Sequence, residues 1–153
     1  MSWLTTEDLE RALIQHNDPS VLNAFQGIYP NNMLPTTNLH VPLFIVVNTD
    51  PHNLAGQHWK VIYINEDYCG EVFDSLALPL SNHVIQFMNR WTRSWRTNRT
   101  MFQHPSSKQC GVYVLYFITQ RLKYSTLTRF CQSLSFSLLE NERKMRAFYR
   151  TLQ

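Results

Sequence analysis

The chain has 153 residues, of which 44% are hydrophobic and 13% aromatic, enough apolar surface for one core but not for two independent cores. No stretch of 18 apolar residues occurs, and the first ten residues carry acids where a secretory signal would be basic and then apolar. The composition therefore argues against a membrane span and against secretion. We expect a soluble, intracellular monomer that folds as one domain over residues 1–153.

Charge is divided unevenly along the chain. Residues 1–89 hold two basic and nine acidic side chains, whereas residues 90–153 hold twelve basic and two acidic ones, for a net charge of +3. This division favours a face that attracts polyanions or acidic partners. A solvated surface that serves only solubility is the alternative.

The three cysteines, Cys69, Cys110 and Cys131, lie far apart and form no CxxC pair. Such spacing argues against a disulfide framework and against a zinc site. We expect reduced thiols and no bound metal.

The first half of the chain predicts one helix, one loop and three strands. Thr5 is placed to cap a helix that ends at residues 17–19, with Asp8 three positions beyond the cap. Residues 26–42, rich in proline and asparagine, predict irregular backbone. Residues 43–47, 59–64 and 68–73 predict short strands, and the polar link at 65–67 predicts that the last two pair antiparallel.

The second half is mostly helical in pattern. Residues 81–96 predict an amphipathic helix with arginines on its polar face, and residues 100–103 predict a short strand. Residues 111–118 are apolar on every side, as in a helix buried at a domain centre. One or two amphipathic helices are expected from residue 126 onward, so the fold class is α+β.

Cys110 directly precedes this apolar run. At the N-terminus of a buried helix, unpaired N–H groups and the helix dipole lower the pKa of a thiol, which is what a cysteine peptidase needs of its nucleophile. Gly111 would leave room for a substrate backbone, and residues 106–109 could present amides to an oxyanion. A buried core thiol is the alternative for Cys110. Cys69 and Cys131 lack this setting.

Three other residues could complete such a site. His58 opens a predicted strand and Asp74 closes the next one, so an antiparallel pair would bring imidazole and carboxylate to the same edge of the sheet, where the acid could orient the base. Gln103, seven residues before Cys110, could donate its amide to an oxyanion. Each residue alone is a weak signal, because a histidine at a strand end is more often structural.

Several motifs stand at characteristic spacing. Asn48 of "VVNTD" lies ten residues before "HW" at His58, the Asp74 of "FDS" follows sixteen residues after His58, and Gln103 precedes "CG" at Cys110 by seven. "FQGIY" near the N-terminus and "LLENERKMRAFY" near the C-terminus accompany them. In these motifs the chain resembles the adenovirus protease (adenain) family, within the clan of ubiquitin-like-protein proteases.

The resemblance implies a papain-like, adenain-like fold in which a central helix carrying the nucleophile packs on a small mixed or antiparallel sheet. It implies a triad of His58, Asp74 and Cys110, with Gln103 and the Cys110 amide as the oxyanion hole. Adenains usually carry glutamate where this chain has Asp74, so that position does not separate the two branches of the clan. We further expect substrate to be bound by Gly56, Trp59 and Gly111.

The resemblance also implies a biological role and partners. Family members are cysteine endopeptidases that process viral precursor proteins during virion maturation, which would place this protein in the host nucleus and the virion. They use DNA as a cofactor, and arginines at three-residue spacing could follow phosphates without reading sequence: Arg90, Arg93, Arg96 and Arg99. The mammalian viral enzymes are activated by a disulfide-linked viral peptide, but Thr92 stands where their cysteine would be. An activating peptide would therefore be noncovalent, if one is used.

Two other functions remain open from the sequence. The chain could be a deconjugating protease that cleaves ubiquitin-like proteins after a diglycine tail. It could also be a non-enzymatic DNA-binding virion protein that kept the fold.

Overall fold

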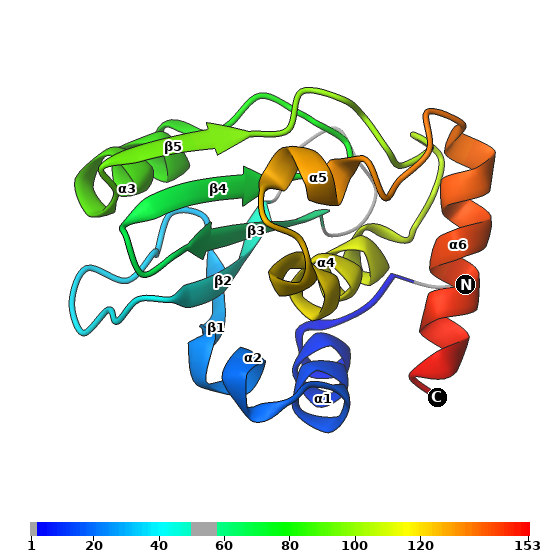
Figure 1. The fold of residues 1–153 in the computed structure, drawn as a ribbon, viewed down its shortest axis with the longest axis horizontal. Coiled ribbons are helices and arrows are strands. Elements are labelled where there is room, and N and C mark those ends of the chain that lie inside the picture. The colour runs from blue at the N-terminus through cyan, green and yellow to red at the C-terminus, as the bar shows by residue number, and fades with distance from the viewer. Residues whose placement is uncertain (1–2, 50–57) are drawn as a thin grey trace.

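A computed structural model describes residues 3–49 and 58–153, and its centre is a five-stranded mixed sheet (Figure 1). The strands lie in sequence order, and the central pairs are antiparallel while the two outer pairs are parallel. Their bounds are β1 Phe25–Pro30, β2 Leu43–Thr49, β3 His58–Ile64, β4 Cys69–Phe73 and β5 Ser94–Thr97.

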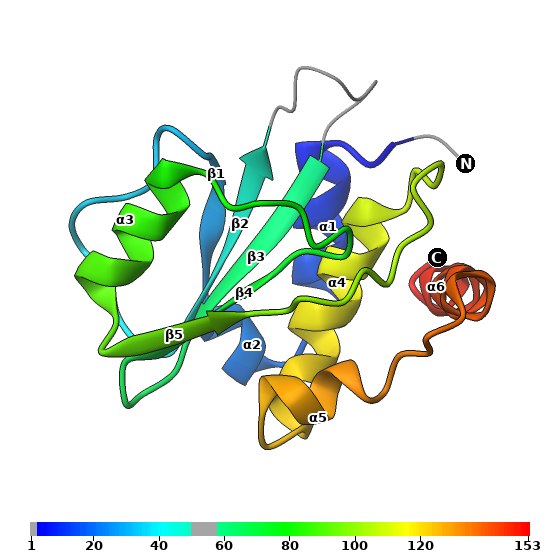
Figure 2. The same ribbon diagram turned by 90° about the horizontal axis from the view of Figure 1, so that it is seen from above.

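Helices cover both faces of this sheet (Figures 1 and 2). Helix α3 lies on one face; α1 and α4 lie on the other, with α6 packed outside α4. The helix bounds are α1 Thr6–His16, α2 Pro19–Ala24, α3 Asn82–Trp91, α4 Cys110–Gln120, α5 Leu127–Cys131 and α6 Leu138–Thr151, with a 3-10 turn at Arg121–Lys123.

Strand β3 is buried along its whole length because it carries apolar side chains on both faces. Val61 and Tyr63 belong to the hydrophobic cluster around α4, whereas Ile62 and Ile64 belong to the cluster around α3. A strand with a side-chain period of two that is covered on both sides needs a nearly continuous apolar sequence. This burial fixes the start of β3, where His58 lies.

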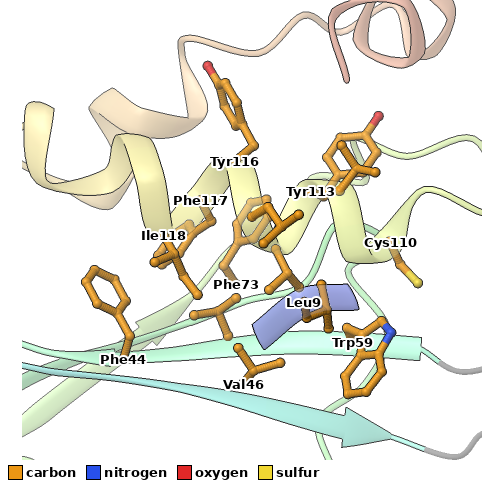
Figure 3. Packing of buried hydrophobic residues seen from close by; sticks show 14 of the residues in the cluster. Leu9, Phe44, Val46, Trp59, Phe73, Cys110, Tyr113, Tyr116, Phe117 and Ile118 are labelled. Atoms are coloured by element: carbon orange, nitrogen blue, oxygen red, sulfur yellow. The ribbon is translucent and has the colours of Figure 1, made fainter. Parts of the chain in front are cut away.

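Helix α4 is the central helix, and every residue from Cys110 to Ile118 is buried (Figure 3). Its Phe117 ring stacks on Phe73 of β4 with ring centroids 4.9 Å apart and meets Phe130 of α5 edge to face at 5.0 Å. Aromatic pairs in such geometries stabilise a core beyond their buried area. The packing therefore anchors α4 against the end of β4, close to Asp74.

Much of the predicted first half is confirmed. Helix α1 begins after Thr5, whose side chain accepts from the Asp8 N–H while Asp8 accepts from the Thr5 N–H. Strands β3 and β4 form the expected antiparallel pair. The loop predicted at residues 26–42 is wrong at its start, because Phe25–Pro30 forms β1, parallel to β2. This edge strand is only half-buried and contains Gly27, so it lacks the apolar signal of the inner strands.

The helix predicted over residues 81–96 is wrong beyond Trp91. Thr92 is extended, and its hydroxyl donates to the Met88 carbonyl at 2.6 Å, at the last turn of α3. The chain then forms β5, in which Trp95 and Thr97 are half-buried and Ser94 and Arg96 are exposed. Because Trp91 and Trp95 are four residues apart, they fit a helical period and a strand period equally well. The strand predicted at residues 100–103 is also wrong, since that segment is irregular.

Candidate active site

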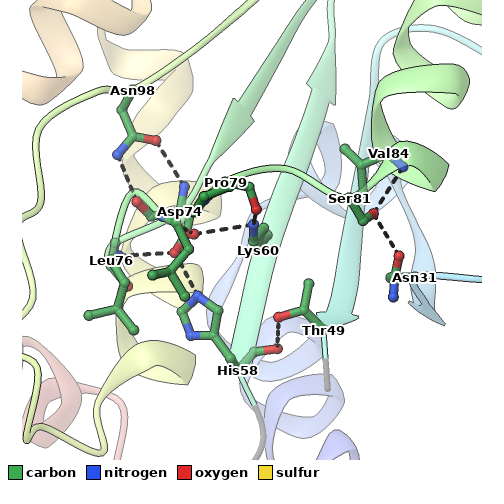
Figure 4. A network of polar contacts seen from close by, with 12 residues as sticks. Asn31, Thr49, His58, Lys60, Asp74, Leu76, Pro79, Ser81, Val84 and Asn98 are labelled. Atoms are coloured by element: carbon green, nitrogen blue, oxygen red, sulfur yellow. Dashed lines mark hydrogen bonds and ion pairs between the residues drawn. The ribbon is translucent and has the colours of Figure 1, made fainter. Parts of the chain in front are cut away.

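His58 and Asp74 meet at one end of the β3–β4 pair. Val61 pairs with Phe73, so the start of β3 lies beside the end of β4. His58 Nε2 lies 2.6 Å from Asp74 Oδ1, and both side chains are almost wholly buried (Figure 4). The structure thus brings together two residues that the sequence placed sixteen positions apart, in the geometry that holds an imidazole by one ring nitrogen.

The Asp74 carboxylate is fully engaged. Oδ1 also accepts from the Leu76 N–H, and Oδ2 accepts from the Leu78 N–H, each at 2.9 Å. Lys60 Nζ lies 3.3 Å from Oδ2. Burial raises the pKa of Asp74, but the hydrogen bond from His58 and the charges of His58 and Lys60 outweigh it, so the pKa is lowered. Asp74 is therefore held as an anion.

The Asp74 backbone is held by Asn98, which follows β5. The Asp74 N–H donates to Asn98 Oδ1 at 2.9 Å, and Asn98 Nδ2 donates to the Asp74 carbonyl at 2.7 Å. A side-chain amide that pairs with both backbone groups fixes the chain direction at that residue. Sequence analysis missed Asn98, because nothing in the local pattern indicates that the chain after β5 returns to the end of β4.

Cys110 is the first residue of α4, and this helix N-terminus differs from the others. Thr5, Asp18, Ser81, Thr126 and Ser137 cap α1, α2, α3, α5 and α6 through their side chains, whereas the N-cap of α4, Gln109, makes no side-chain cap. Backbone N–H groups of Trp59 and Gly111 hydrogen-bond toward the Cys110 thiol. The sulfur thus lies beside the start of β3, within reach of the Asp74 charge, and Figure 3 shows Cys110 near Trp59.

The thiol pKa runs against the prediction from sequence. Burial raises the pKa of Cys110 to about 11, although the N–H groups of Trp59 and Gly111 pull it down. The side chain is 1% exposed and lies among apolar neighbours, so loss of solvation exceeds the effect of the helix N-terminus. The resting form is therefore a protonated thiol, and a thiolate requires a base that takes the proton.

Gln103 is buried between the end of β4 and the loop that precedes α4. Its Oε1 accepts from the Ser75 hydroxyl at 2.6 Å, and its Nε2 donates to the Ser107 carbonyl at 3.0 Å. The N–H groups of Phe102 and Gln103 both donate to the Ser75 carbonyl. The Gln103 amide nitrogen carries two N–H groups. One of them donates to Ser107, so Nε2 has a second N–H as a further donor.

Glu142 of α6 holds both ends of this loop. Its Oε1 accepts from the His104 N–H at 3.2 Å, and its Oε2 accepts from Gln109 Nε2 at 2.8 Å and from the Tyr113 hydroxyl at 3.2 Å. His104 follows Gln103, and Gln109 precedes Cys110. Sequence analysis missed Glu142, because charged residues of an amphipathic helix normally face solvent.

The three residues predicted to bind substrate have different positions. Gly56 lies outside the described residues. Trp59 is 1% exposed and packs in the core beside α4, so it offers no surface to a ligand in this structure. A Cβ at Gly111 would lie 3.0 Å from the Leu4 Cβ, so the small size of this glycine accommodates the chain before α1.

The four arginines predicted to bind DNA are exposed but do not share one helix face. Arg90 belongs to the last turn of α3, Arg93 to the link after it, Arg96 to β5 and Arg99 to the segment beyond. The predicted ridge along a helix is therefore wrong. Arg90 lies over the Trp91 ring, 5.3 Å from its centroid.

A cavity of about 750 Å³ lies beside this edge of the sheet, lined by residues of β5, the segment after it, α5 and the chain that follows α5. Phe136, which is 91% exposed, is one of its lining residues.

Within residues 3–49 and 58–153, no three histidine, cysteine, aspartate or glutamate side chains gather as metal ligands would. In the same ranges, no helix combines the length and apolar character needed to cross a bilayer.

Comparison with known proteins shows the fold. No protein-family model and no curated protein sequence matches the chain. The ASFV pS273R protease shares the fold with a TM-score of 0.56 and 19% identity over 84% of this chain and 61% of its own. ChlaDub1 from Chlamydia trachomatis does so with a TM-score of 0.56 and 14% identity over 71% of this chain and 60% of its own.

This chain thus spans about three fifths of either protein. The similarity, with the five-stranded mixed sheet and the central helix α4, confirms the predicted α+β, papain-like fold class. At these identities it shows the fold alone.

Proposed function

We propose that the protein is a cysteine endopeptidase in which Cys110 is the nucleophile, His58 the base and Asp74 the residue that orients the base. One observation carries the proposal: His58 contacts Asp74 at 2.6 Å, and both Asp74 and the Trp59 N–H act on the thiol of Cys110 at the N-terminus of α4, which has no side-chain cap. A fold shared with the ASFV pS273R protease supports it.

The chemistry follows from which ring nitrogen is engaged. Asp74 accepts from Nε2 of His58, so Nδ1 is the atom that takes the thiol proton. The resulting thiolate attacks the peptide carbonyl, and the imidazolium then gives its proton to the leaving amine. Water hydrolyses the thioester in the second half of the reaction. Asp74, held as an anion, stabilises the imidazolium between these two transfers.

The negative charge that develops on the substrate oxygen needs donors. The proposed donors are the Cys110 backbone N–H and the Gln103 amide, which the Ser75 hydroxyl holds at its Oε1. Since the side chains of Cys110 and His58 are almost wholly buried, a substrate reaches them only after the groups covering them move. Peptide cleavage thus needs an opening step.

Cleavage of a mixed peptide library by the wild type and by the Cys110→Ala variant tests the proposal. We expect cleavage by the wild type and none by the variant at equal folded concentration. Equal cleavage by both would contradict the role of Cys110, and the absence of wild-type cleavage under every condition would favour a non-enzymatic protein.

The biological role is part of the same proposal. By its motifs the chain resembles adenain, so we propose that it processes viral precursor proteins during virion maturation, in the host nucleus and the virion. Competition between precursor-like peptides and ubiquitin-like fusion proteins tests this assignment. Preference for a folded ubiquitin-like substrate would instead identify a deconjugating protease.

DNA is a proposed cofactor. The support is the run of exposed arginines from Arg90 to Arg99, in the half of the chain that carries twelve of the fourteen basic residues. Fluorescence anisotropy with a duplex of arbitrary sequence should show binding that weakens steeply with salt. Simultaneous replacement of Arg90, Arg93 and Arg96 by alanine should weaken it further. Unchanged binding by this variant would contradict the proposal.

A noncovalent activating peptide is proposed as a second cofactor. Its support is strand β5, the last strand of the sheet, which lies beside the cavity that contains exposed Phe136. An extended peptide can pair with such an edge and place side chains in an adjacent pocket. Added precursor-derived peptides should raise the cleavage rate of the wild type, and Phe136→Ser should reduce that gain.

A further inference from the structure

Lys60 is a buried cation in an otherwise apolar stretch of β3. The rest of the strand after His58 consists of Trp59, Val61, Ile62, Tyr63 and Ile64. The Lys60 side chain is only 3% exposed. Lysine is almost never this buried unless its charge is paired, because removing an ammonium group from water is costly.

The partner of Lys60 is the carboxylate that holds His58. Lys60 Nζ lies 3.3 Å from Asp74 Oδ2, while His58 Nε2 lies 2.6 Å from Oδ1 of the same group (Figure 4). Val61 pairs with Phe73, so the antiparallel register continued by one residue places Lys60 opposite Asp74. Opposite charges directly across an antiparallel pair stabilise each other.

Lys60 also contacts the turn that surrounds this carboxylate. Its Nζ donates to the Pro79 carbonyl at 3.4 Å, while the Leu76 and Leu78 N–H groups donate to Asp74 from the same turn. Lys60 thus connects β3 to the turn after β4, and its contacts with Asp74 and Pro79 engage two of the three N–H donors of its ammonium group.

We propose that Lys60 is a positioning residue that fixes the Asp74 carboxylate for His58 and sets the charge of the site by neutralising that carboxylate from behind. The inference rests on the proposed peptidase function. The charged groups that act on the Asp74 carboxylate are His58 and Lys60 of β3, and Asp74 is the charged group that acts on Cys110. A fixed positive charge among them favours the deprotonated form of each.

The pair Lys60→Met and Lys60→Arg separates charge from packing. Without the Lys60 cation, the neighbouring groups lose their protons only at higher pH. The pH profile of kcat/KM for Lys60→Met should therefore move upward by about one pH unit, the size of effect expected of a charge a few ångströms away. At a fixed pH on the acid side of the wild-type optimum, kcat/KM should therefore fall by up to about tenfold. Lys60→Arg should keep the wild-type profile. If the pH profile of kcat/KM for Lys60→Met coincides with that of the wild type, the inference is overturned.

A second readout does not depend on cleavage. The imidazole resonances of His58, followed by NMR across pH in the Cys110→Ala background, should titrate at higher pH in Lys60→Met than in the background, and unchanged in Lys60→Arg. Coincident titration curves would overturn the role of Lys60. If the wild type cleaves no peptide while the curves separate, the charge coupling stands and the peptidase proposal fails.

Discussion

Two buried carboxylates, Glu71 within β4 and Asp74 directly after it, are held in different ways. Glu71 receives both a 2.7 Å bond from Arg121 Nε and a 2.6 Å bond from Arg121 Nη2, a bidentate pair. Asp74 instead receives His58 on one oxygen and Lys60 on the other. Arginine keeps its charge at any physiological pH, whereas histidine changes charge near neutrality.

The difference separates a structural ion pair from the proposed catalytic one. The Arg121 guanidinium also covers the Tyr63 ring and donates to the Tyr124 carbonyl, so the Glu71 pair ties β4 to the turn after α4 and has no group that moves a proton. The Asp74 site has an acceptor on His58 and a thiol beside it. Burial of a carboxylate therefore does not indicate catalysis unless its partner can change protonation state.

The largest expected effect comes from neutralising Asp74. Asp74→Asn should lower kcat/KM by about 10³-fold to 10⁴-fold, because the imidazole loses the anion that orients and stabilises it. Glu71→Gln is the matched control, and it should stay within about threefold of the wild type per folded molecule. Steady-state kinetics with a cleaved library peptide measure both. Equal losses in the two variants would remove the distinction.

The next effect concerns stability. Arg121→Met should lower the free energy of unfolding by about 3–5 kcal/mol, because it leaves the Glu71 charge buried and unpaired. The double variant Glu71→Leu with Arg121→Met should recover most of that loss. Urea unfolding measures each value. A double variant no more stable than Arg121→Met would show that the pair is not the source of the loss.

Glu142 is a third buried carboxylate, and it contacts the loop before Cys110 through hydrogen bonds. Its replacement tests whether these hydrogen bonds affect the candidate site. In Glu142→Gln one acceptor oxygen becomes a donor, so bonds from the His104 N–H, Gln109 or Tyr113 are lost. We expect about 1–3 kcal/mol less stability and about a tenfold lower kcat. The exposed Glu140 of the same helix is the control. A Glu140→Gln variant with the same defects would contradict the role of Glu142.

The effect confined to the narrowest range of conditions is a loss of stability at alkaline pH. The pKa of Cys110 rises from 9.0 to about 11 on folding, so the native state binds the proton more tightly. Stability from this group is present below pH 9.0 and is lost as pH rises through 11, by about 3 kcal/mol in all. Cys110→Ala should flatten this part of the stability curve in urea unfolding. A variant with the wild-type slope would contradict the burial of the thiol.

Much of the fold could be predicted from sequence, because β2, β3, β4 and α4 carry strong apolar patterns. The contact between His58 and Asp74 followed from the short link between two antiparallel strands. Strand β5 could not be predicted, because it is a partly exposed edge strand whose Trp95, four residues after Trp91 of α3, also fits a helical period.

The support around the candidate site was less accessible to sequence analysis. The supporting contacts join residues that are 24 to 38 positions apart, and no local pattern encodes them. They are Asn98 with Asp74, Ser75 with Gln103, and Glu142 with His104. Lys60 did leave a signal, since a charge inside an apolar strand needs a buried partner. The raised pKa of Cys110 could not be predicted from the sequence. Burial of the thiol raises the pKa more than the helix N-terminus lowers it, and the extent of that burial is seen only in the three-dimensional structure.

Covalent capture of the nucleophile tests the central claim most directly. A peptide with an electrophilic ketone, incubated with the protein near neutral pH and followed by peptide mass spectrometry, should label Cys110, although Cys69 is exposed and Cys110 is buried. The label on Cys110 should disappear in His58→Ala. Labelling that follows exposure, with Cys69 modified first and Cys110 no faster in the wild type than in His58→Ala, would contradict the account.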